Sequence, residues 1–331
     1  MKAAELLEKV RKIARKKPVK IVICEGWDER VLRATAVVLK EKLAQIILMG
    51  EPSVIKNKAN ELKVDISGAE IVDFKKSKLK KELAEKLYEL RKAKGMTIEE
   101  AAKLIENENY FGCMFAYAGY ADAVGGSAIC PTAELMRPAL QILRKKDALV
   151  SEIMVMHDPK NDRVIFLSDA SLNIEPNSEQ LAEIALNAAE AVRDVGMVPK
   201  VALLSFSTKG SGGDGPQVTW IREAVKIAQQ KDKTLLIDGE MQVDAAVSQF
   251  ASGRKCPHSP LKGEANALIM PSLTTGNILM HALVQFSQMS VLYIALKGME
   301  KPVSLFGRSM PAESIANILA GLAMEANSGR K

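Results

Sequence analysis

The sequence predicts an α/β protein made of two domains, each built around a largely parallel sheet. Short apolar runs of strand length alternate with longer amphipathic stretches whose apolar residues have helical spacing. The connections between them are tight, which is typical of parallel sheets wrapped by helices. A chain of 331 residues is also long enough for two domains of ordinary size.

In the first half, apolar residues at Leu6, Leu7, Val10 and Ile13 indicate an opening helix, which ends before Pro18. The elements expected there, in order, are a helix at 3–16, a strand at 19–24, a helix at 28–40, strands at 45–49 and 71–74, and a helix at 78–94 that Gly95 terminates.

The alternation continues in the second half, after a charge cluster at 145–147 that marks the crossing between domains. The expected elements are strands at 151–156 and 164–168, a helix at 179–195, a strand at 201–205, a helix at 217–230, strands at 234–237 and 267–270, a helix at 277–287, a strand at 290–294 and a helix at 312–325.

Composition argues against several classes of protein. The net charge is +6 and aromatic residues make up 5%, without interleaving the lysine clusters, so a nucleic-acid groove is a poor fit. The longest apolar runs have six residues, far short of a membrane span, and residues 1–17 do not resemble a signal peptide. We expect a cytoplasmic protein.

Four scattered cysteines without a CxxC pair predict free thiols and no metal.

A glycine-rich loop at 205–215 follows one expected strand and precedes a helix. Backbone N–H groups of such a loop and the helix N-terminus attract an anion, here a phosphate. The candidate ligands are Ser207, Thr208, Lys209, Gly210 and Ser211. A plain flexible turn is one alternative. A dinucleotide loop is another, because Gly210, Gly212 and Gly215 fit GxGxxG; however, Asp232 lies in a turn, whereas that fingerprint needs an acid at a strand end.

A second loop, at 125–132, opens a helix that carries Arg137 near its start. A positive charge there opposes the helix dipole, and such an arginine is often retained to hold an anion. The alternative is a surface ion pair with Glu134 at i−3. Asp238, Glu240 and Asp244 follow an expected strand, and we expect these acids to cap the next helix.

Together these pieces resemble the phosphate acetyltransferase (phosphotransacetylase) and phosphate butyryltransferase family, over essentially the whole chain. Each segment is weak alone, but nine occur in the family's order. The matching segments are 25–32, 91–97, 132–141, 179–185, 204–211, 238–240, 263–266, 276–278 and 301–303.

The resemblance implies two α/β domains facing a cleft, as in isocitrate and isopropylmalate dehydrogenases, with 1–147 and 297–331 forming the first and 148–296 the second. It implies a homodimer assembled through the second domain. The implied reaction converts acetyl-CoA and phosphate reversibly to acetyl phosphate and coenzyme A, without an acyl-enzyme. Coenzyme A is then a substrate, and no cofactor or metal is expected.

The resemblance also assigns site residues. Arg91 and Arg137 match arginines of the family's site, and Arg308 matches the arginine of a catalytic Ser-Arg pair. Further substrate-binding positions are Thr132, the loop residues 207–211 and Asn277.

Three positions depart from the family pattern: Gly307 replaces the serine of the pair, Ser314 the catalytic aspartate, and Gln285 a substrate-binding arginine. A serine cannot deprotonate a thiol of pKa about 8.5 near neutral pH. The thiolate must then come from solvent, from another carboxylate, or from a thiol pKa lowered by Arg308. Phosphate butyryltransferases resemble this chain in carrying a hydroxyl residue there. A catalytically impaired or regulatory homologue that binds coenzyme A or acyl phosphate is the alternative.

Overall fold

The computed structural model describes residues 1–328, which form two compact units. The terminal unit comprises Leu7–Ala148 together with Met299 and the residues after it, and the central unit comprises Met1–Leu6 and Leu149–Gly298. The predicted domains differ from these units in Met1–Leu6 and, by one or two residues at the crossings, in Ala148, Lys297 and Gly298. Met1–Leu6 join the central unit, where Val164 N–H donates to the Met1 carbonyl at 3.2 Å and Lys2 pairs with Asp162 at 2.9 Å. Within residues 1–328, no helix is long and apolar enough to cross a membrane.

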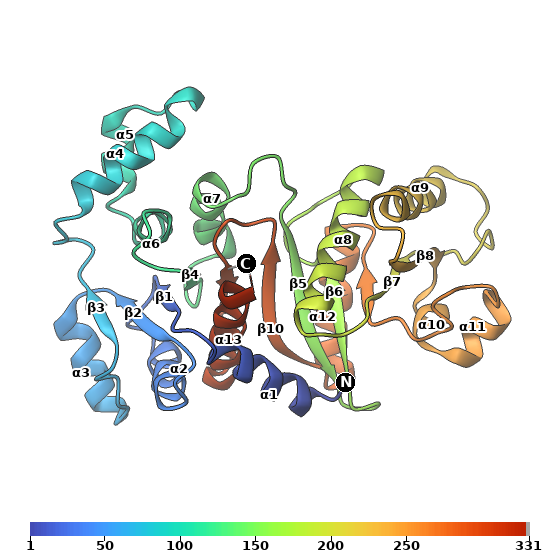
Figure 1. Cartoon of the computed structure of the whole chain (residues 1–331), viewed down its shortest axis with the longest axis horizontal. Helices are drawn as coiled ribbons and strands as arrows, with labels where there is room; N and C mark the ends of the chain where they lie inside the picture. Colours follow the sequence, from blue (N-terminus) through green and yellow to red (C-terminus); the bar gives the residue numbers. More distant parts are fainter. Residues whose placement is uncertain (329–331) are drawn as a thin grey trace. The chain divides into compact units, whose positions relative to one another are not determined.

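The terminal unit contains a five-stranded sheet in the order β11-β4-β1-β2-β3, in which every pair is parallel (Figure 1). Its strands are β1 Lys20–Ile23, β2 Gln45–Met49, β3 Glu70–Val72, β4 Ala123–Gly126 and β11 Val303–Leu305. The last strand completes the sheet beside β4, so both ends of the chain contribute to this unit. The strands are apolar runs, because crossover helices cover the faces of a parallel sheet.

Helices connect these strands. They are α1 Ala3–Ala14, α2 Glu29–Lys40, α3 Pro52–Leu62, α4 Lys80–Arg91, the 3₁₀ turn η1 Lys92–Lys94, α5 Ile98–Leu104, α6 Glu108–Tyr117, α7 Thr132–Ile142 and α13 Ala312–Ser328. The predicted helix at 78–94 is shorter than expected, because the chain tightens into η1 after Arg91. Gly95 then ends it at φ +88°, a conformation that favours glycine.

The central unit contains a six-stranded sheet in the order β10-β5-β6-β9-β7-β8. Its strands are β5 Ser151–Asp158, β6 Arg163–Ser168, β7 Lys200–Leu204, β8 Leu236–Met241, β9 Ala267–Ile269 and β10 Ser290–Lys297. β10, β5 and β6 pair antiparallel, whereas β6, β9, β7 and β8 are parallel. The helices are α8 Ser178–Asp194, α9 Pro216–Lys231, α10 Val243–Val247, α11 Gln249–Lys255 and α12 Leu273–Ser287.

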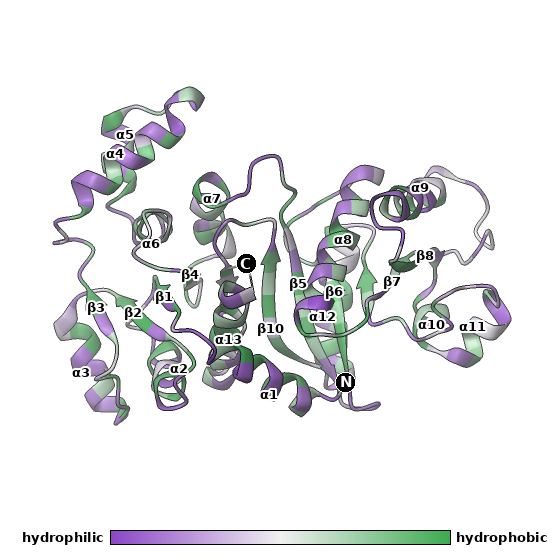
Figure 2. Ribbon diagram, in the orientation of Figure 1, coloured by the Kyte–Doolittle hydropathy of each residue, from purple (hydrophilic) through white to green (hydrophobic). Residues whose placement is uncertain are grey.

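Hydropathy follows this architecture. The strands labelled in Figure 2 are mostly hydrophobic, whereas α3 and α4 carry hydrophilic residues along much of their length. Because all five strands of the terminal unit are parallel, the loops after them lie along one edge of the sheet. Ligands of open α/β sheets bind at this carboxyl edge, which is therefore the first place to look for a site.

Candidate active site

A buried carboxylate organises the carboxyl edge of the terminal unit. Glu25 follows β1 and is 1% exposed. It accepts hydrogen bonds from three consecutive backbone N–H groups, those of Ala128, Ile129 (3.1 Å) and Cys130 (2.7 Å). Such a cluster of N–H groups attracts an anion, and Glu25 supplies it from within the chain. The loop that leads into α7 is thereby fixed.

Arg30 ties two loops of this edge together, and the expectations from sequence did not assign it a role. Its guanidinium pairs with Asp28 through two bonds of 3.1 and 2.9 Å. It also donates to the carbonyls of Ala128 and Arg308, each at 2.7 Å, and of Gly307 at 3.3 Å. The backbone after β11 is therefore held against the loop after β4. The one sequence signal was its place in the family-like segment 25–32.

Arg91 and Arg137 both lie close to Tyr110, although they come from different helices. Burial raises the pKa of the Tyr110 hydroxyl, and the charges of Arg137 and Arg91 act against this rise. Arg91 is the last residue of α4, and its Nε is buried without a hydrogen-bond partner among the described residues. Two predicted anion-binding residues from different helices thus act on the same tyrosine.

Among the described residues, Arg137 and Glu134 form no ion pair. The alternative interpretation of Arg137, a surface ion pair with Glu134 on α7, is therefore wrong. The Arg137 side chain is exposed, and the described residues give it no hydrogen-bond partner. Two guanidinium groups without carboxylates present several donors in the geometry that suits phosphate. Thr132 is exposed at the start of the same helix.

The residues of the terminal unit that differ from the family pattern come after β11, together with Arg308. Gly307 is half-buried and Arg308 is exposed, while Ser314 is half-buried in the first turn of α13. A Cβ at Gly307 would lie 3.0 Å from the Met310 Cγ, so a serine there would need a small shift of Met310. Arg308 shares the carboxyl edge with Arg91 and Arg137, although no hydrogen bond joins it to them.

The glycine-rich loop of the central unit is already occupied by a carboxylate, Glu240 of β8. Gly210 N–H donates to Glu240 Oε1 at 2.8 Å, and the Ser207 hydroxyl donates to the same oxygen at 3.0 Å. Arg222 of α9 donates to Glu240 Oε2 at 2.6 Å and also pairs with Asp214. Two of the predicted phosphate donors are therefore engaged by a carboxylate from inside the unit, and substrate binding by residues 207–211 stays a prediction.

Electrostatics agree with this arrangement. Burial by itself would raise the pKa of Glu240, but hydrogen bonds from Arg222, Gly210 and Ser207 lower it to about 2. Glu240 is therefore ionised at neutral pH. A second anion at the same N–H groups would meet a buried negative charge at short range.

The other predicted loop residues are also held within the loop. Thr208 N–H donates to Ser211 Oγ at 2.9 Å, and the Thr208 hydroxyl contacts Gln242 at 3.3 Å. Lys209 pairs with Asp238, which is itself 7% exposed. These residues form a hydrogen-bonded turn beside β8, which counts against the alternative of a plain flexible turn.

The acidic residues of the central unit differ in part from what the sequence predicted. Asp238 and Glu240 do not cap a helix, because they lie within β8, and α10 begins after Gln242 without a side-chain cap. Asp232 ends α9 and accepts a hydrogen bond from Arg193 at 2.6 Å, so it is not the strand-end acid of a dinucleotide fingerprint. Within residues 1–328, no group of three His, Cys, Asp or Glu side chains could hold a metal ion.

Asn277 and Gln285 both lie on α12. Asn277 donates to the Ala170 carbonyl at 3.4 Å, and Gln285 is exposed. They are eight residues apart, about 12 Å along the helix axis, so they can contact one small ligand only through long side chains. Near the first turns of α12, an apolar cavity of about 680 Å³ is lined by Phe206, Trp220 and Leu279, among others.

Comparison with known proteins accords with this geometry. Residues 5–323 match the family model described as phosphate acetyl/butaryl transferase. A phosphate acetyltransferase from Clostridium acetobutylicum is 37% identical over 332 residues, covering 98% of this chain and 99% of that protein. The crystal structure of a phosphotransacetylase from Streptococcus pyogenes superposes with a TM-score of 0.93 at 35% identity, covering 99% of this chain and 100% of that chain.

A more distant likeness concerns the fold alone. A putative 4-hydroxythreonine-4-phosphate dehydrogenase from Salmonella typhimurium has a TM-score of 0.57 at 12% identity, with 94% of this chain covered. This likeness agrees with the predicted dehydrogenase-like α/β architecture. The match over residues 5–323, with relatives above 30% identity over nearly their whole length, shows that the chain belongs to the phosphate acetyl/butaryl transferase family.

Proposed function

We propose that this protein transfers an acetyl group between coenzyme A and inorganic phosphate, reversibly forming acetyl phosphate. The observation that carries the proposal is the pair Arg91 and Arg137, which approach Tyr110 without carboxylate partners at the carboxyl edge of a parallel sheet. Phosphate is the substrate that two such guanidinium groups bind best. The names of the relatives support the same reaction.

The proposed mechanism needs no covalent intermediate. In the direction of acetyl-CoA synthesis, the thiol loses its proton and the thiolate attacks the carbonyl carbon of acetyl phosphate. The C–O bond to phosphate then breaks, and the arginines stabilise the negative charge on the leaving phosphate. Arg308 would stabilise the charge that develops on the carbonyl oxygen. Ser314 can orient the thiol through its hydroxyl but cannot take the proton.

Release of free thiol tests this function directly. Purified protein should release coenzyme A from acetyl-CoA only when phosphate or arsenate is present, because the acyl group needs an oxyanion acceptor. Butyryl-CoA, assayed in parallel, defines the acyl preference. Release that ignores phosphate would identify a thioesterase, and no release from either thioester would favour a homologue that only binds these substrates.

A homodimer assembled through α12 also belongs to this proposal. The helix has a strongly apolar sequence, yet Gly276 is the single buried residue among its fifteen, and Ile278 and Phe286 are 64% and 89% exposed. Contiguous exposed apolar residues of this kind mark interaction surfaces. Phe286→Glu should shift the mass measured by light scattering from dimer to monomer. A wild-type chain that is monomeric at micromolar concentration would refute this part.

The cytoplasm is the compartment that fits the proposed substrates. Coenzyme A works there as a free thiol, and the four cysteines of the chain are likewise unpaired. Fractionation of cells that produce the protein should recover it with the cytosolic fraction. Recovery with membranes or in the medium would contradict this assignment.

A further inference from the structure

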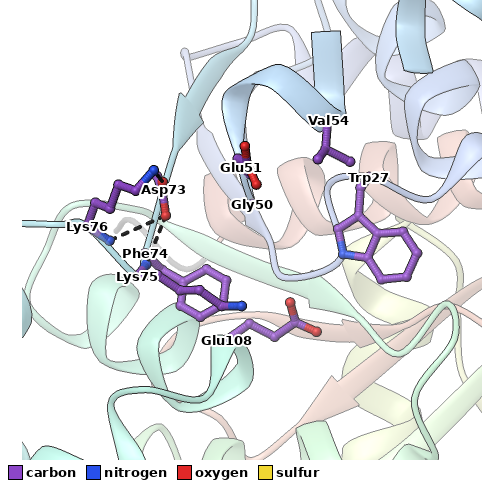
Figure 3. A pocket seen from close by; sticks show the side chains of 9 residues that line it. All are labelled: Trp27, Gly50, Glu51, Val54, Asp73, Phe74, Lys75, Lys76 and Glu108. Carbon is purple, nitrogen blue, oxygen red and sulfur yellow. Dashed lines mark hydrogen bonds and ion pairs between the residues drawn. The ribbon is translucent and has the colours of Figure 1, made fainter. Parts of the chain in front are cut away.

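A pocket of about 320 Å³ lies at the carboxyl edge of the terminal unit, where β1, β2 and β3 end (Figure 3). Trp27 follows β1, Glu51 follows β2, and Asp73 to Lys76 follow β3. Glu108, in the first turn of α6, closes one side, and Figure 3 shows its carboxylate directed toward the space beside Trp27. The expectations from sequence assigned no role in the site to any residue of this pocket, although Trp27 lies in the family-like segment 25–32.

Charge indicates which part of a substrate the pocket suits. Trp27, Val54 and Phe74 make its walls apolar, and Lys75 lies over the Phe74 ring with its Nζ 5.9 Å from the centroid. Lys76 pairs with Asp73 at 3.6 Å. With three carboxylates against two lysines, the pocket disfavours a diphosphate or nucleotide phosphate. A neutral, mostly apolar chain, such as the pantetheine arm of coenzyme A, fits it better.

Among the three carboxylates, Glu108 is the one that the described residues leave without a hydrogen bond or ion pair. Glu51 accepts from the Ser53 hydroxyl at 2.6 Å, and Asp73 accepts from the Lys75 backbone N–H at 3.1 Å. A half-buried carboxylate with free lone pairs that faces a pocket can accept a proton from a bound group.

Glu108 lies near the loop that opens α7, the helix that carries Arg137. Its charge interacts with those of Glu25, which follows β1, and of Glu134, in the first turn of α7. Glu25 in turn accepts hydrogen bonds from backbone N–H groups of the loop that leads into α7. The α6 N-terminus therefore places a free carboxylate at the apolar pocket, on the edge of the sheet where α7 begins.

We propose that Glu108 is the general base of this enzyme: the thiol arm of coenzyme A lies in the pocket beside Trp27, and Glu108 takes its proton. The inference rests on the proposed function and supplies the base that Ser314 cannot provide. The S–H proton passes to a Glu108 oxygen, the sulfur forms a bond to the acyl carbon, and the C–O bond to phosphate breaks. The proton then leaves to solvent or to the phosphate.

The electrostatic surroundings of Glu108 suit this role. Burial raises its pKa to about 7, the charges of Glu25 and Glu134 act in the same direction, and Lys75 opposes them. Glu25 follows β1, Glu134 lies on α7 and Lys75 follows β3, so the charged groups on every side of the carboxylate are accounted for. A base of this pKa is closely matched to a thiol of pKa about 8.5.

Glu108→Gln removes the base while keeping size and shape. In the direction of acetyl-CoA synthesis, kcat should fall by about 10²–10⁴-fold. The wild-type rate should level off above an apparent pKa near 7, whereas the variant should keep rising toward the thiol pKa. Glu108→Asp should recover part of the rate. Glu99→Gln, an exposed residue in the first turn of α5, is the matched control and should leave rate and pH profile unchanged.

A second readout does not depend on turnover. The chain has two tryptophans, so Trp220→Phe leaves Trp27 as the one indole fluorophore. Its emission should titrate with a midpoint near 7, the midpoint should shift when coenzyme A is added, and Glu108→Gln should abolish the titration.

The outcomes separate the two claims. If the wild type transfers acetyl groups and Glu108→Gln stays within about twofold of it with the same pH profile, Glu108 is not the base and the proposed function stands. If the wild type shows no phosphate-dependent transfer, the proposed function fails and this inference fails with it. Loss of rate together with loss of the Trp27 titration supports both.

Discussion

At Tyr110, the charges of two guanidinium groups, one from α4 and one from α7, act on a single hydroxyl, and neither has a carboxylate partner in the described part of the chain. A guanidinium without a carboxylate partner keeps its donors available for an anion. Elsewhere on the same edge, Arg30 shows the opposite case, since its guanidinium is saturated by Asp28 and backbone carbonyls. The contrast separates a structural arginine from the two that we assign to phosphate.

Arg137→Lys should raise the Michaelis constant for phosphate. An ammonium group is a point charge without the guanidinium fork, so one of two charge-assisted hydrogen bonds is lost. That loss costs about 1.5–3 kcal/mol, or roughly tenfold to a hundredfold in affinity. Initial rates over a range of phosphate concentrations measure it. Unchanged phosphate kinetics would make Arg137 a structural residue.

Ser314→Asp tests the other candidate position for a base. The new carboxylate would stand in the first turn of α13, where the helix dipole favours negative charge. We expect it to restore about tenfold or more of the rate that Glu108→Gln loses, and to change the wild-type rate much less, because one base suffices. If Ser314→Asp accelerates the wild type a hundredfold, no base operates in the natural chain.

The loop between β7 and α9 shows how a carboxylate of the chain itself can occupy donors that the sequence suggests for a ligand. Its glycines, hydroxyls and lysine have the composition of an anion site, and the anion is Glu240, about thirty residues further along the chain. In the loop after β4, backbone N–H groups likewise donate to a carboxylate of the chain, that of Glu25. Each glycine-rich turn is thereby fixed to a neighbouring strand of its own sheet.

Glu240→Gln should destabilise the protein by about 3 kcal/mol at pH 7, because Arg222 and the loop N–H groups lose a buried ionic acceptor. The pKa of Glu240 is lowered to about 2, so its contribution is present above its ordinary pKa and is lost as the pH falls toward 2. Urea unfolding at pH 7 and pH 3 should show the difference shrinking. Glu183→Gln, which breaks an exposed pair with Lys231, is the control. A constant difference at both pH values would contradict this assignment.

Long, periodic elements were predictable, and short ones were not. The helices at 179–195 and 217–230 are confirmed as α8 and α9 because each has an extended apolar face. β4 and β11 were missed, since four residues with two glycines, or three residues, carry almost no periodicity. β5 and β6 were expected as strands, and they pair antiparallel with each other across a short turn, whereas the partner on the other side of β5 is β10, more than a hundred residues away.

The candidate site was likewise only partly predictable from the sequence. Family-like segments identified Arg91 and Arg137, yet their approach to Tyr110 depends on how α4, α6 and α7 pack. Glu108 carried no sequence signal, and Trp27 had only its place in the family-like segment 25–32. Their roles emerge from the pocket they share, which forms only when the ends of three strands meet.

At the scale of the whole molecule, two buried acids of the central unit, Glu152 and Asp169, should make the free energy of unfolding decrease toward alkaline pH. Burial raises the pKa of Glu152 to about 8, and the nearby Asp169 adds to the rise. The folded state therefore holds a proton that the unfolded state releases above its ordinary pKa of 4.5, so this group lowers stability as the pH rises from about 4.5 to 8.

Glu152→Gln removes that titration. Its melting temperature should exceed that of the wild type by an amount that grows between pH 5 and pH 9, as followed by circular dichroism. Glu183→Gln should show no such trend, because Glu183 is at the surface. A difference that does not vary with pH would mean that Glu152 is ionised in the folded state throughout this range.

The terminal unit has a fully parallel sheet, and we assign the substrate-binding arginines to this unit. The proposed function is a single reaction, the transfer of an acetyl group between coenzyme A and phosphate. Phosphorus NMR of the protein mixed with acetyl-CoA and inorganic phosphate follows that reaction directly. We predict a growing acetyl phosphate signal, matched in amount by free coenzyme A and reversed when coenzyme A is added in excess. Free coenzyme A that appears without acetyl phosphate, or no change in either, would contradict the account.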